Sequence, residues 1–302
     1  MTEPVARETW IAPAKVNLWL AILGRRDDGY HEIDTGLQAI DLADTLSLEP
    51  APAGLELDCK VDGDWRNVVP AGEENLAARA ARLLAARTGH ALRLSLTIDK
   101  AIPPGAGLGG GSSDAAAVLV ALARRFAVPD PGHTLHALAA ELGADVPFFL
   151  AGGTQRARGI GDRLEPIDPP GERWGVLVWP GVFIDTAWAY HAWDEMRANG
   201  TGASPVRPGR NDFESIVFDH YPAVRRAADV LASSAAAAVT LSGSGGAVYA
   251  LYGDRAARDT EHDRVRGEVS AISPEGRTWA FTTIDHGVRP AEGRPRRASS
   301  FR

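Results

Sequence analysis

The sequence has very little lysine and almost no cysteine. Of its 32 basic residues only three are lysines, Lys15, Lys60 and Lys100, and Cys59 is its only cysteine. A single cysteine excludes an intramolecular disulfide framework, a CxxC redox pair and a cysteine-cluster metal site, which fits a reducing cytoplasm. In a chain that otherwise uses arginine, a lysine is expected where a compact point charge is needed. Lys60, in a polar stretch, is expected on the surface.

Long apolar runs and excess positive charge are also missing. No segment approaches the roughly 18 apolar residues of a membrane span, and residues 1–10 contain no apolar run of signal-peptide type. The net charge is −7, whereas a nucleic-acid binder usually carries a basic patch or stripe. We therefore expect neither a membrane nor a nucleic acid as a partner.

The 302 residues are enough for about two domains. Strands are predicted at residues 10–22, 37–48, 92–98 and 174–179, and a strand, turn and strand at 239–251. Helices are predicted after a cap at Asn75, at 114–126, at 133–142 and at 211–232, the last with a break at Pro222. Because strands and helices mix without strict alternation, the sequence favours an α+β fold.

The strongest local signal is a glycine-rich loop that runs into a helix at residues 103–114. Glycines let backbone N–H groups converge on an anion, and the N-terminus of the following helix favours negative charge at the same point. Ser112 and Ser113 add hydroxyl donors and are expected to cap the helix. The segment predicts a polyphosphate cradle, and the alternative is a flexible Gly/Ser turn.

Three further segments carry polar residues in apolar surroundings. Lys15 and Asn17 are two apart in an apolar strand, so they share one face. Asp145 stands in an apolar stretch after a helix, where a buried charge needs a partner, and Lys15 is the candidate. The alternatives are a water-facing strand for the first pair and a turn cap for Asp145. Residues 241–248 form a second Gly/Ser turn, which alone would indicate a hairpin.

Together these segments resemble the GHMP small-molecule kinases over nearly the whole chain. The resemblance rests on PAKVNL, DDGYHEI, TGLQAIDLADTL, KAIPPGAGLGGGSSDAA, LGADVPFFL, GIGDRL, PGVFIDTAWAY, NDFE and LSGSGGAVYAL. The glycine loop is typical of the superfamily. PAKVNL, GYH and LGADVPFF indicate the branch that acts on a cytidine diphosphate-linked polyol.

The resemblance implies a two-lobed α+β kinase with an ATP-binding N-terminal domain at 1–165. It further implies a smaller α/β-sandwich substrate domain at 166–286, and we expect 287–302 to be a disordered tail. The implied reaction moves the γ-phosphoryl group of ATP, with Mg²⁺, to the 2-hydroxyl of 4-diphosphocytidyl-2-C-methyl-D-erythritol in non-mevalonate isoprenoid precursor biosynthesis. The protein would be a cytoplasmic monomer or homodimer.

The resemblance also implies roles for individual residues. Lys15 and Asp145 would be catalytic, and no residue is assigned to a metal. The substrate would be bound by Asn17, Tyr30, His31, Thr186 and Tyr190, with the tyrosines stacking on cytosine and His31 at its edge. ATP would be bound by Lys100, Pro103, Pro104, Gly105, Ala106, Gly107, Leu108, Gly109, Gly110, Gly111, Ser112 and Ser113.

Three positions depart from the family pattern: Gly36, Asp185 and Ala247. They leave details of the substrate pocket open. Two other functions stay open as well. One is a GHMP kinase for another alcohol, such as mevalonate or homoserine, and the other is a nucleotide-binding module without catalysis.

Overall fold

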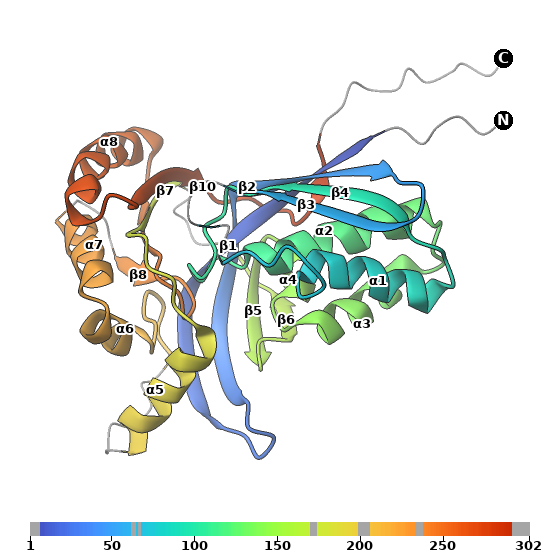
Figure 1. The fold of residues 1–302 in the computed structure, drawn as a ribbon. Coiled ribbons are helices and arrows are strands. Elements are labelled where there is room, and N and C mark those ends of the chain that lie inside the picture. The colour runs from blue at the N-terminus through green and yellow to red at the C-terminus, as the bar shows by residue number, and fades with distance from the viewer. Residues whose placement is uncertain are drawn as a thin grey trace.

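The computed structural model describes residues 7–61, 65, 68–169, 174–198, 206–233 and 238–291. Two β-sheets, each covered by helices, lie side by side and are joined by the long strands β1 and β2 (Figure 1). This confirms the expected α+β fold with two lobes. The boundary expected between residues 165 and 166 stays a prediction.

The first sheet has the strand order β11-β1-β2-β4-β3, and β5 pairs with β2 and β6 beside this path. All its pairs are antiparallel except β3 with β4, which is parallel. Its strands are β1 (Glu8–Arg25), β2 (His31–Pro50), β3 (Gly54–Lys60), β4 (Arg93–Asp99), β5 (Thr154–Gly159), β6 (Arg163–Pro166) and β11 (Arg289–Pro290).

Four helices pack together beside this sheet (Figure 1). They are α1 (Leu76–Thr88), α2 (Gly110–Arg125), α3 (Pro131–Leu142) and α4 (Val146–Ala151). The core between them and the sheet is rich in alanine and leucine, and small residues let α1 and α2 approach closely. Asn75 caps α1 as predicted, because its side chain accepts a hydrogen bond from the N–H of Ala77.

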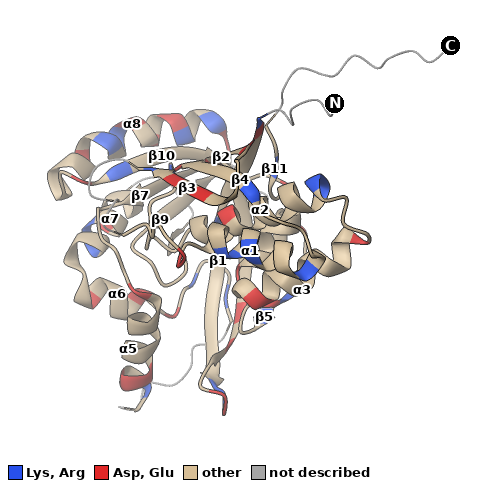
Figure 2. Cartoon of the chain, turned by 45° about the vertical axis from the view of Figure 1, so that its right-hand side comes forward, with Lys and Arg blue, Asp and Glu red and all other residues tan. Residues whose placement is uncertain are grey.

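The second sheet is antiparallel, in the order β10-β7-β9-β8. Its elements are β7 (Trp174–Trp179), α5 (Thr186–Ala198), α6 (Glu214–His220), α7 (Pro222–Ala232), β8 (Val239–Leu241), β9 (Val248–Tyr252), α8 (Arg255–Ile272) and β10 (Arg277–Thr282). The break predicted at Pro222 is confirmed, since α7 begins there. Helix α8 carries charges of both signs on its outer side (Figure 2). In the described ranges, no helix combines the length and the apolar character needed to cross a membrane.

Two predictions about boundaries are wrong. Helix α2 begins at Gly110 rather than at residue 114, because Gly109 takes a left-handed conformation (φ 72°) as its N-cap. The serines therefore lie inside the first turn and do not cap the helix. Residues 287–291 are not a loose tail: β11 pairs with β1, and the N–H of Val288 donates to the carbonyl of Phe149. Residues 292–302 lie outside the described ranges.

Strand β1 has an extra residue at Leu18, at one of the three points where its pairing with β2 shifts register. The carbonyl of Leu18 accepts from the N–H of Gly209, and Leu20 exchanges backbone hydrogen bonds with Arg210 and Asp212. The strand is thus hydrogen-bonded to β2 and to a segment of the second lobe. Lys15, three residues earlier, lies where the two lobes meet.

Candidate active site

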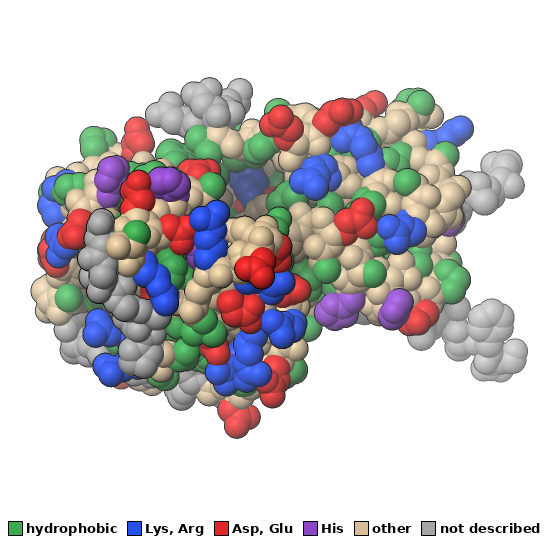
Figure 3. Space-filling view, turned by 90° about the horizontal axis from the view of Figure 1, so that it is seen from below, with side chains coloured by type: hydrophobic (Ala, Val, Ile, Leu, Met, Phe, Trp, Pro, Cys, Tyr) green, Lys and Arg blue, Asp and Glu red, His purple; other side chains and the backbone are tan. Residues whose placement is uncertain are grey.

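One large cavity of about 1170 Å³ lies between the lobes. The molecule is hollowed between two thicker parts on the face seen in Figure 3. The glycine loop and the start of α2 line its middle, Lys100 and Asn75 line one end, and Tyr30 and His31 line the other. A single space therefore reaches most of the residues predicted to bind ATP and the substrate.

Lys15 is a buried residue that lines this cavity. Its side chain is 4% exposed, and its ammonium donates to Asn17 Oδ1 over 2.6 Å and to the carbonyl of Gly107 over 2.7 Å. Asn17 in turn donates to the hydroxyl of Thr35 over 2.9 Å. Burial lowers the pKa of Lys15, and the charge of Asp145 opposes that effect. The predicted shared face of Lys15 and Asn17 is therefore confirmed.

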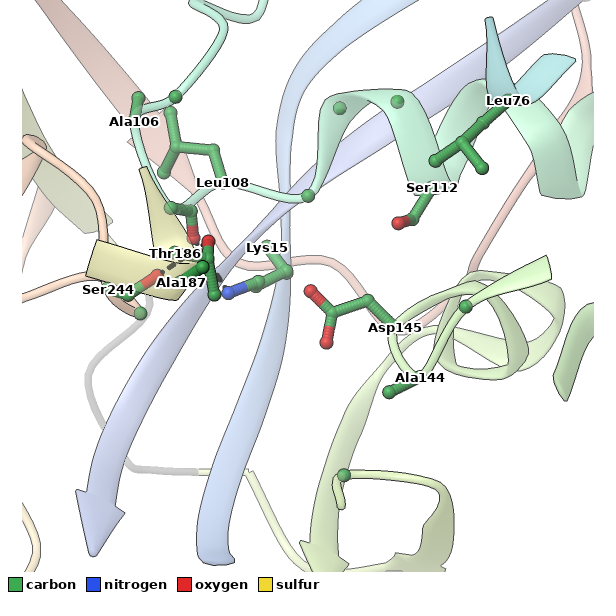
Figure 4. A pocket seen from close by; sticks show the side chains of 18 of the residues that line it. Lys15, Leu76, Ala106, Leu108, Ser112, Ala144, Asp145, Thr186, Ala187 and Ser244 are labelled. Carbon is green, nitrogen blue, oxygen red and sulfur yellow. Dashed lines mark hydrogen bonds between the residues drawn. The ribbon is translucent and has the colours of Figure 1, made fainter. Parts of the chain in front are cut away.

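Asp145 faces Lys15 across the cavity from the start of α4 (Figure 4). The ion pair expected between them is not formed, since the Lys15 ammonium bonds Asn17 and Gly107 and leaves a gap before the carboxylate. Asp145 makes no side-chain cap bond to α4 either, so it is not the turn cap considered as the alternative. The gap leaves room for a reacting group between the two charges.

The glycine loop contacts Lys15 directly, through the carbonyls of Gly107 and Leu108. Gly107 has φ 79°, and a Cβ there would lie 1.9 Å from the carbonyl oxygen of Ser242. Only glycine allows this contact between the two Gly/Ser loops. The hydroxyl of Ser242 donates to the carbonyl of Gly107 over 3.0 Å. The turn at 241–248 is therefore a hairpin turn that also packs against the glycine loop.

The start of α2 presents N–H groups to the cavity, as an anion site requires. The cavity is lined by Pro103, Pro104, Gly105, Ala106, Gly107, Leu108, Gly109, Gly110, Gly111 and Ser112. Ser113 was predicted with them but does not line the cavity. One helical step turns it away from Ser112, and its buried hydroxyl has no hydrogen-bond partner among the described residues.

Lys100 lines the cavity, and its ammonium forms ion pairs with two buried carboxylates. Its ammonium pairs with Asp44, and with Asp114 at 2.8 Å, and all three side chains are almost fully buried. Burial works to lower the pKa of Lys100, but Asp114 and Asp44 raise it above the ordinary value. Asp44 also accepts from the N–H groups of Ala101 and Ile102, at 2.6 and 2.8 Å. No pattern in the sequence predicted this cluster.

At the far end of the cavity His31 stacks on Tyr190, with ring centres 4.5 Å apart. Its Nε2 atom lies 2.8 Å from Asp194 Oδ1 on α5, a contact that sequence reasoning missed. Burial raises the pKa of the Tyr190 phenol. Tyr30 is 61% exposed, so it does not pack its turn onto the sheet. Thr186 lies 2.9 Å from Ser244, hydroxyl to hydroxyl, at the cavity wall.

The three departures from the family pattern have local structural explanations. Gly36 makes room for the ring of Trp19, which would overlap any Cβ at that position. Asp185 accepts from the N–H of Trp188 and so caps α5. Ala247 is fully buried, and its N–H donates to Ala106. None of the three lines the cavity.

Mg²⁺ commonly binds substrate phosphates, waters and one or two protein oxygens. The described residues hold no cluster of three histidine, cysteine or acidic side chains suited to a metal. Ser112, half-buried beside the N-terminus of α2, directs its hydroxyl into the cavity (Figure 4). The Ser112 hydroxyl, beside a helix N-terminus suited to bind phosphate, fits a Mg²⁺ ion that is held mostly by phosphate oxygens.

Comparisons with known proteins agree with this geometry. The family model for the GHMP kinases N terminal domain matches residues 75–153, and that for the GHMP kinases C terminal matches 193–270. A 4-diphosphocytidyl-2-C-methyl-D-erythritol kinase of Chlorobaculum parvum is 39% identical over 282 residues, covering 88% of this chain and 96% of the relative. One from Chlorobaculum tepidum is 42% identical over 264 residues, covering 81% and 89%.

Solved structures show the same similarity. The crystal structure of a 4-(cytidine 5'-diphospho)-2C-methyl-D-erythritol kinase matches with a TM-score of 0.71 at 37% identity, covering 91% of this chain and 98% of that one. A homoserine kinase from Cytophaga hutchinsonii shares the fold, with a TM-score of 0.70 at 16% identity, covering 96% and 99%. The chain belongs to the GHMP kinases and, within them, to the 4-diphosphocytidyl-2-C-methyl-D-erythritol kinases.

Proposed function

We propose that Lys15 and Asp145 are the catalytic residues with which this chain phosphorylates the 2-hydroxyl of 4-diphosphocytidyl-2-C-methyl-D-erythritol. The observation that carries the proposal is their placement: an ammonium and a carboxylate face each other across a gap, beside the N-terminus of α2. Phosphoryl transfer depends mostly on positioning and on charge stabilisation, and this arrangement supplies both. The reaction belongs to non-mevalonate isoprenoid precursor biosynthesis.

In the proposed reaction the acceptor hydroxyl lies between Lys15 and Asp145. The hydroxyl oxygen forms a bond to the γ-phosphorus of ATP while the bond from that phosphorus to the bridging oxygen of ADP breaks. Asp145 takes the hydroxyl proton. Lys15, held by Asn17 and Gly107, stabilises the attacking oxygen and the transferred group. Asn17 positions the acceptor.

The triphosphate is assigned to the N–H groups at the start of α2 and to the glycine loop. Ser112, together with the phosphates, would hold Mg²⁺, which would supply positive charge to the transferring phosphate. Lys100 would offer an N–H donor at the nucleotide end, in a position fixed by Asp44 and Asp114. Ser113 is left out of this assignment because it faces away from the cavity.

Cytidine is assigned to the other end of the cavity. Tyr30 and Tyr190 supply aromatic planes, His31 supplies a ring nitrogen for the base edge, and Thr186 lies on the path to the reacting end. Base–aromatic stacking contributes about 1–3 kcal/mol in nucleic-acid sites. A cavity of about 1170 Å³ has room for two nucleotide-like ligands end to end.

A coupled ADP-release assay tests this assignment. The purified chain is given ATP, Mg²⁺ and one of three acceptors: the cytidylyl substrate, mevalonate or homoserine. ADP release only with the cytidylyl acceptor is expected. Equal or faster release with mevalonate or homoserine would overturn the acceptor assignment, and nucleotide binding without turnover on any acceptor would favour a non-catalytic module.

A further inference from the structure

Three side chains of α5 fix the ring of His31 at the end of the cavity. Tyr190 stacks on one side with planes 20° apart, and Trp193 meets the ring edge-on at 5.6 Å. Asp194 bonds Nε2 over 2.8 Å. In the described part of the chain this is the only hydrogen bond of the imidazole, and Nδ1 is not among the buried atoms that lack a partner. The second ring nitrogen is therefore accessible to a ligand.

The hydrogen bond to Asp194 selects one form of the imidazole. An ionised carboxylate can only accept, so Nε2 must carry the proton. Arg25 lies 3.5 Å from the other oxygen of Asp194 and places a cation beside that charge. A neutral imidazole has a single N–H, so Nδ1 is left as an acceptor. The tautomer of His31 is therefore set by its contact with Asp194.

An acceptor at this point distinguishes cytosine from uracil. Cytosine presents an exocyclic amino group, which donates, where uracil presents a carbonyl oxygen, which can only accept. Nδ1 as an acceptor bonds the first and repels the second. A site built to hydrogen-bond a donor rejects an analogue that lacks it far more strongly than a hydrophobic pocket rejects a misfit.

We propose that Asp194 is a positioning residue that makes the acceptor site selective for cytosine over uracil, by holding His31 in the tautomer whose Nδ1 accepts. The proposal rests on the proposed function, in which His31 meets the base edge. Asp194 lines the cavity, but in this proposal it acts on the base through His31.

A kinetic comparison tests the proposal with two acceptors that differ only in the base, cytosine or uracil. At pH 8 the wild type is expected to prefer cytosine by at least about a hundredfold in kcat/KM. Asp194→Asn should narrow that ratio at least about tenfold, because the amide can turn its NH₂ toward Nε2 and release the other tautomer. Asp194→Glu keeps an acceptor-only group and should restore part of the ratio.

Glu195→Gln is the matched control. Glu195 is the next residue on α5, is exposed, and pairs with His191 at 3.7 Å. Removing its charge should leave the ratio unchanged. If Asp194→Asn lowered kcat/KM for both acceptors by the same factor, Asp194 would be only structural and the proposal would be wrong. If the wild type turned over neither acceptor, the proposed function itself would fail.

Nitrogen-15 NMR of the histidine rings gives a readout that does not depend on activity. In the full-length wild type at pH 8, the His31 signal, assigned by its loss in His31→Gln, should show a protonated Nε2 and an unprotonated Nδ1. A protonated Nδ1 in the neutral ring would overturn the proposal whatever the kinetics show.

Discussion

The ammonium of Lys15 and the hydroxyl of Ser242 donate to the same atom, the carbonyl oxygen of Gly107. Lys15 comes from the first sheet and Ser242 from the hairpin of the second. The proposed catalytic lysine is therefore held by a contact that needs both lobes. Its position is fixed by main-chain geometry more than by an ion pair.

Replacing either charged group at the reacting centre should nearly abolish turnover. Lys15→Ala and Asp145→Asn are each expected to lower kcat by at least about a hundredfold, the scale of general acid–base catalysis. ADP release measures the effect, and nucleotide titration should show that Asp145→Asn still binds ATP. Lys60→Ala is the control, because the side chain of that lysine is 57% exposed and pairs with Asp99 at 3.6 Å. Near-normal turnover in Asp145→Asn would remove the base assignment.

The cradle can be tested at Gly111 with the least damage to the fold. A Cβ at Gly110 would press on Ile102 at 3.0 Å, whereas at Gly111 the nearest atom, on Leu76, is 3.7 Å away. Gly111→Val should raise the Kd for ATP about tenfold or more, since its side chain enters the cavity. Gly132→Val on α3, where a Cβ has open space, controls for valine in a helix. Equal ATP affinity in both variants would place the triphosphate elsewhere.

Tyr30 should affect the acceptor alone. Because it is 61% exposed, Tyr30→Ala should leave the melting temperature almost unchanged. Its loss is expected to raise the KM for the acceptor about tenfold and to leave the KM for ATP as it is. A parallel loss of both substrates and of thermal stability would show that the ring supports the fold instead.

The buried cluster around Lys100 should be costly to disturb. Asp44→Asn removes a buried carboxylate that bonds the Lys100 ammonium and the N–H groups of Ala101 and Ile102, and it should lower the free energy of unfolding by about 3 kcal/mol. Asp99→Asn is the comparison, since it breaks an exposed pair with Lys60 and should change stability by less than about 1 kcal/mol. Urea unfolding measures both. A similar small change in the two variants would contradict the view that burial sets the cost.

Glu214 should make stability fall as pH rises. Burial raises its pKa to about 7, above that of the unfolded chain, so the folded state holds the proton longer. Its contribution is fully present below the unfolded pKa and is lost as pH rises through about 7. Between pH 4.5 and pH 8 the wild type should lose about 2 kcal/mol relative to Glu214→Gln. Parallel pH curves for the two proteins would refute the assignment.

Local patterns were enough to predict much of the site. The spacing of Lys15 and Asn17 fixes their shared strand face, and a run of glycines before a helix predicts an anion cradle. Two features were not predicted: one depends on a long-range contact and the other on a local backbone conformation. Asp194 is one of two carboxylates on α5, and only folding brings it to His31. The start of α2 depends on Gly109 taking a left-handed conformation, which permissive glycines do not reveal.

Around the extra residue at Leu18, strand β1 is hydrogen-bonded to both lobes. Its backbone pairs with β2 on one side and bonds residues 209–212 on the other. Side-chain substitutions leave backbone hydrogen bonds in place, so the lobe junction can tolerate extensive sequence drift. Insertions and deletions are different, because each one shifts which residues face the cavity. Among related enzymes, the number of residues in β1 and β2 should vary less than their amino-acid composition.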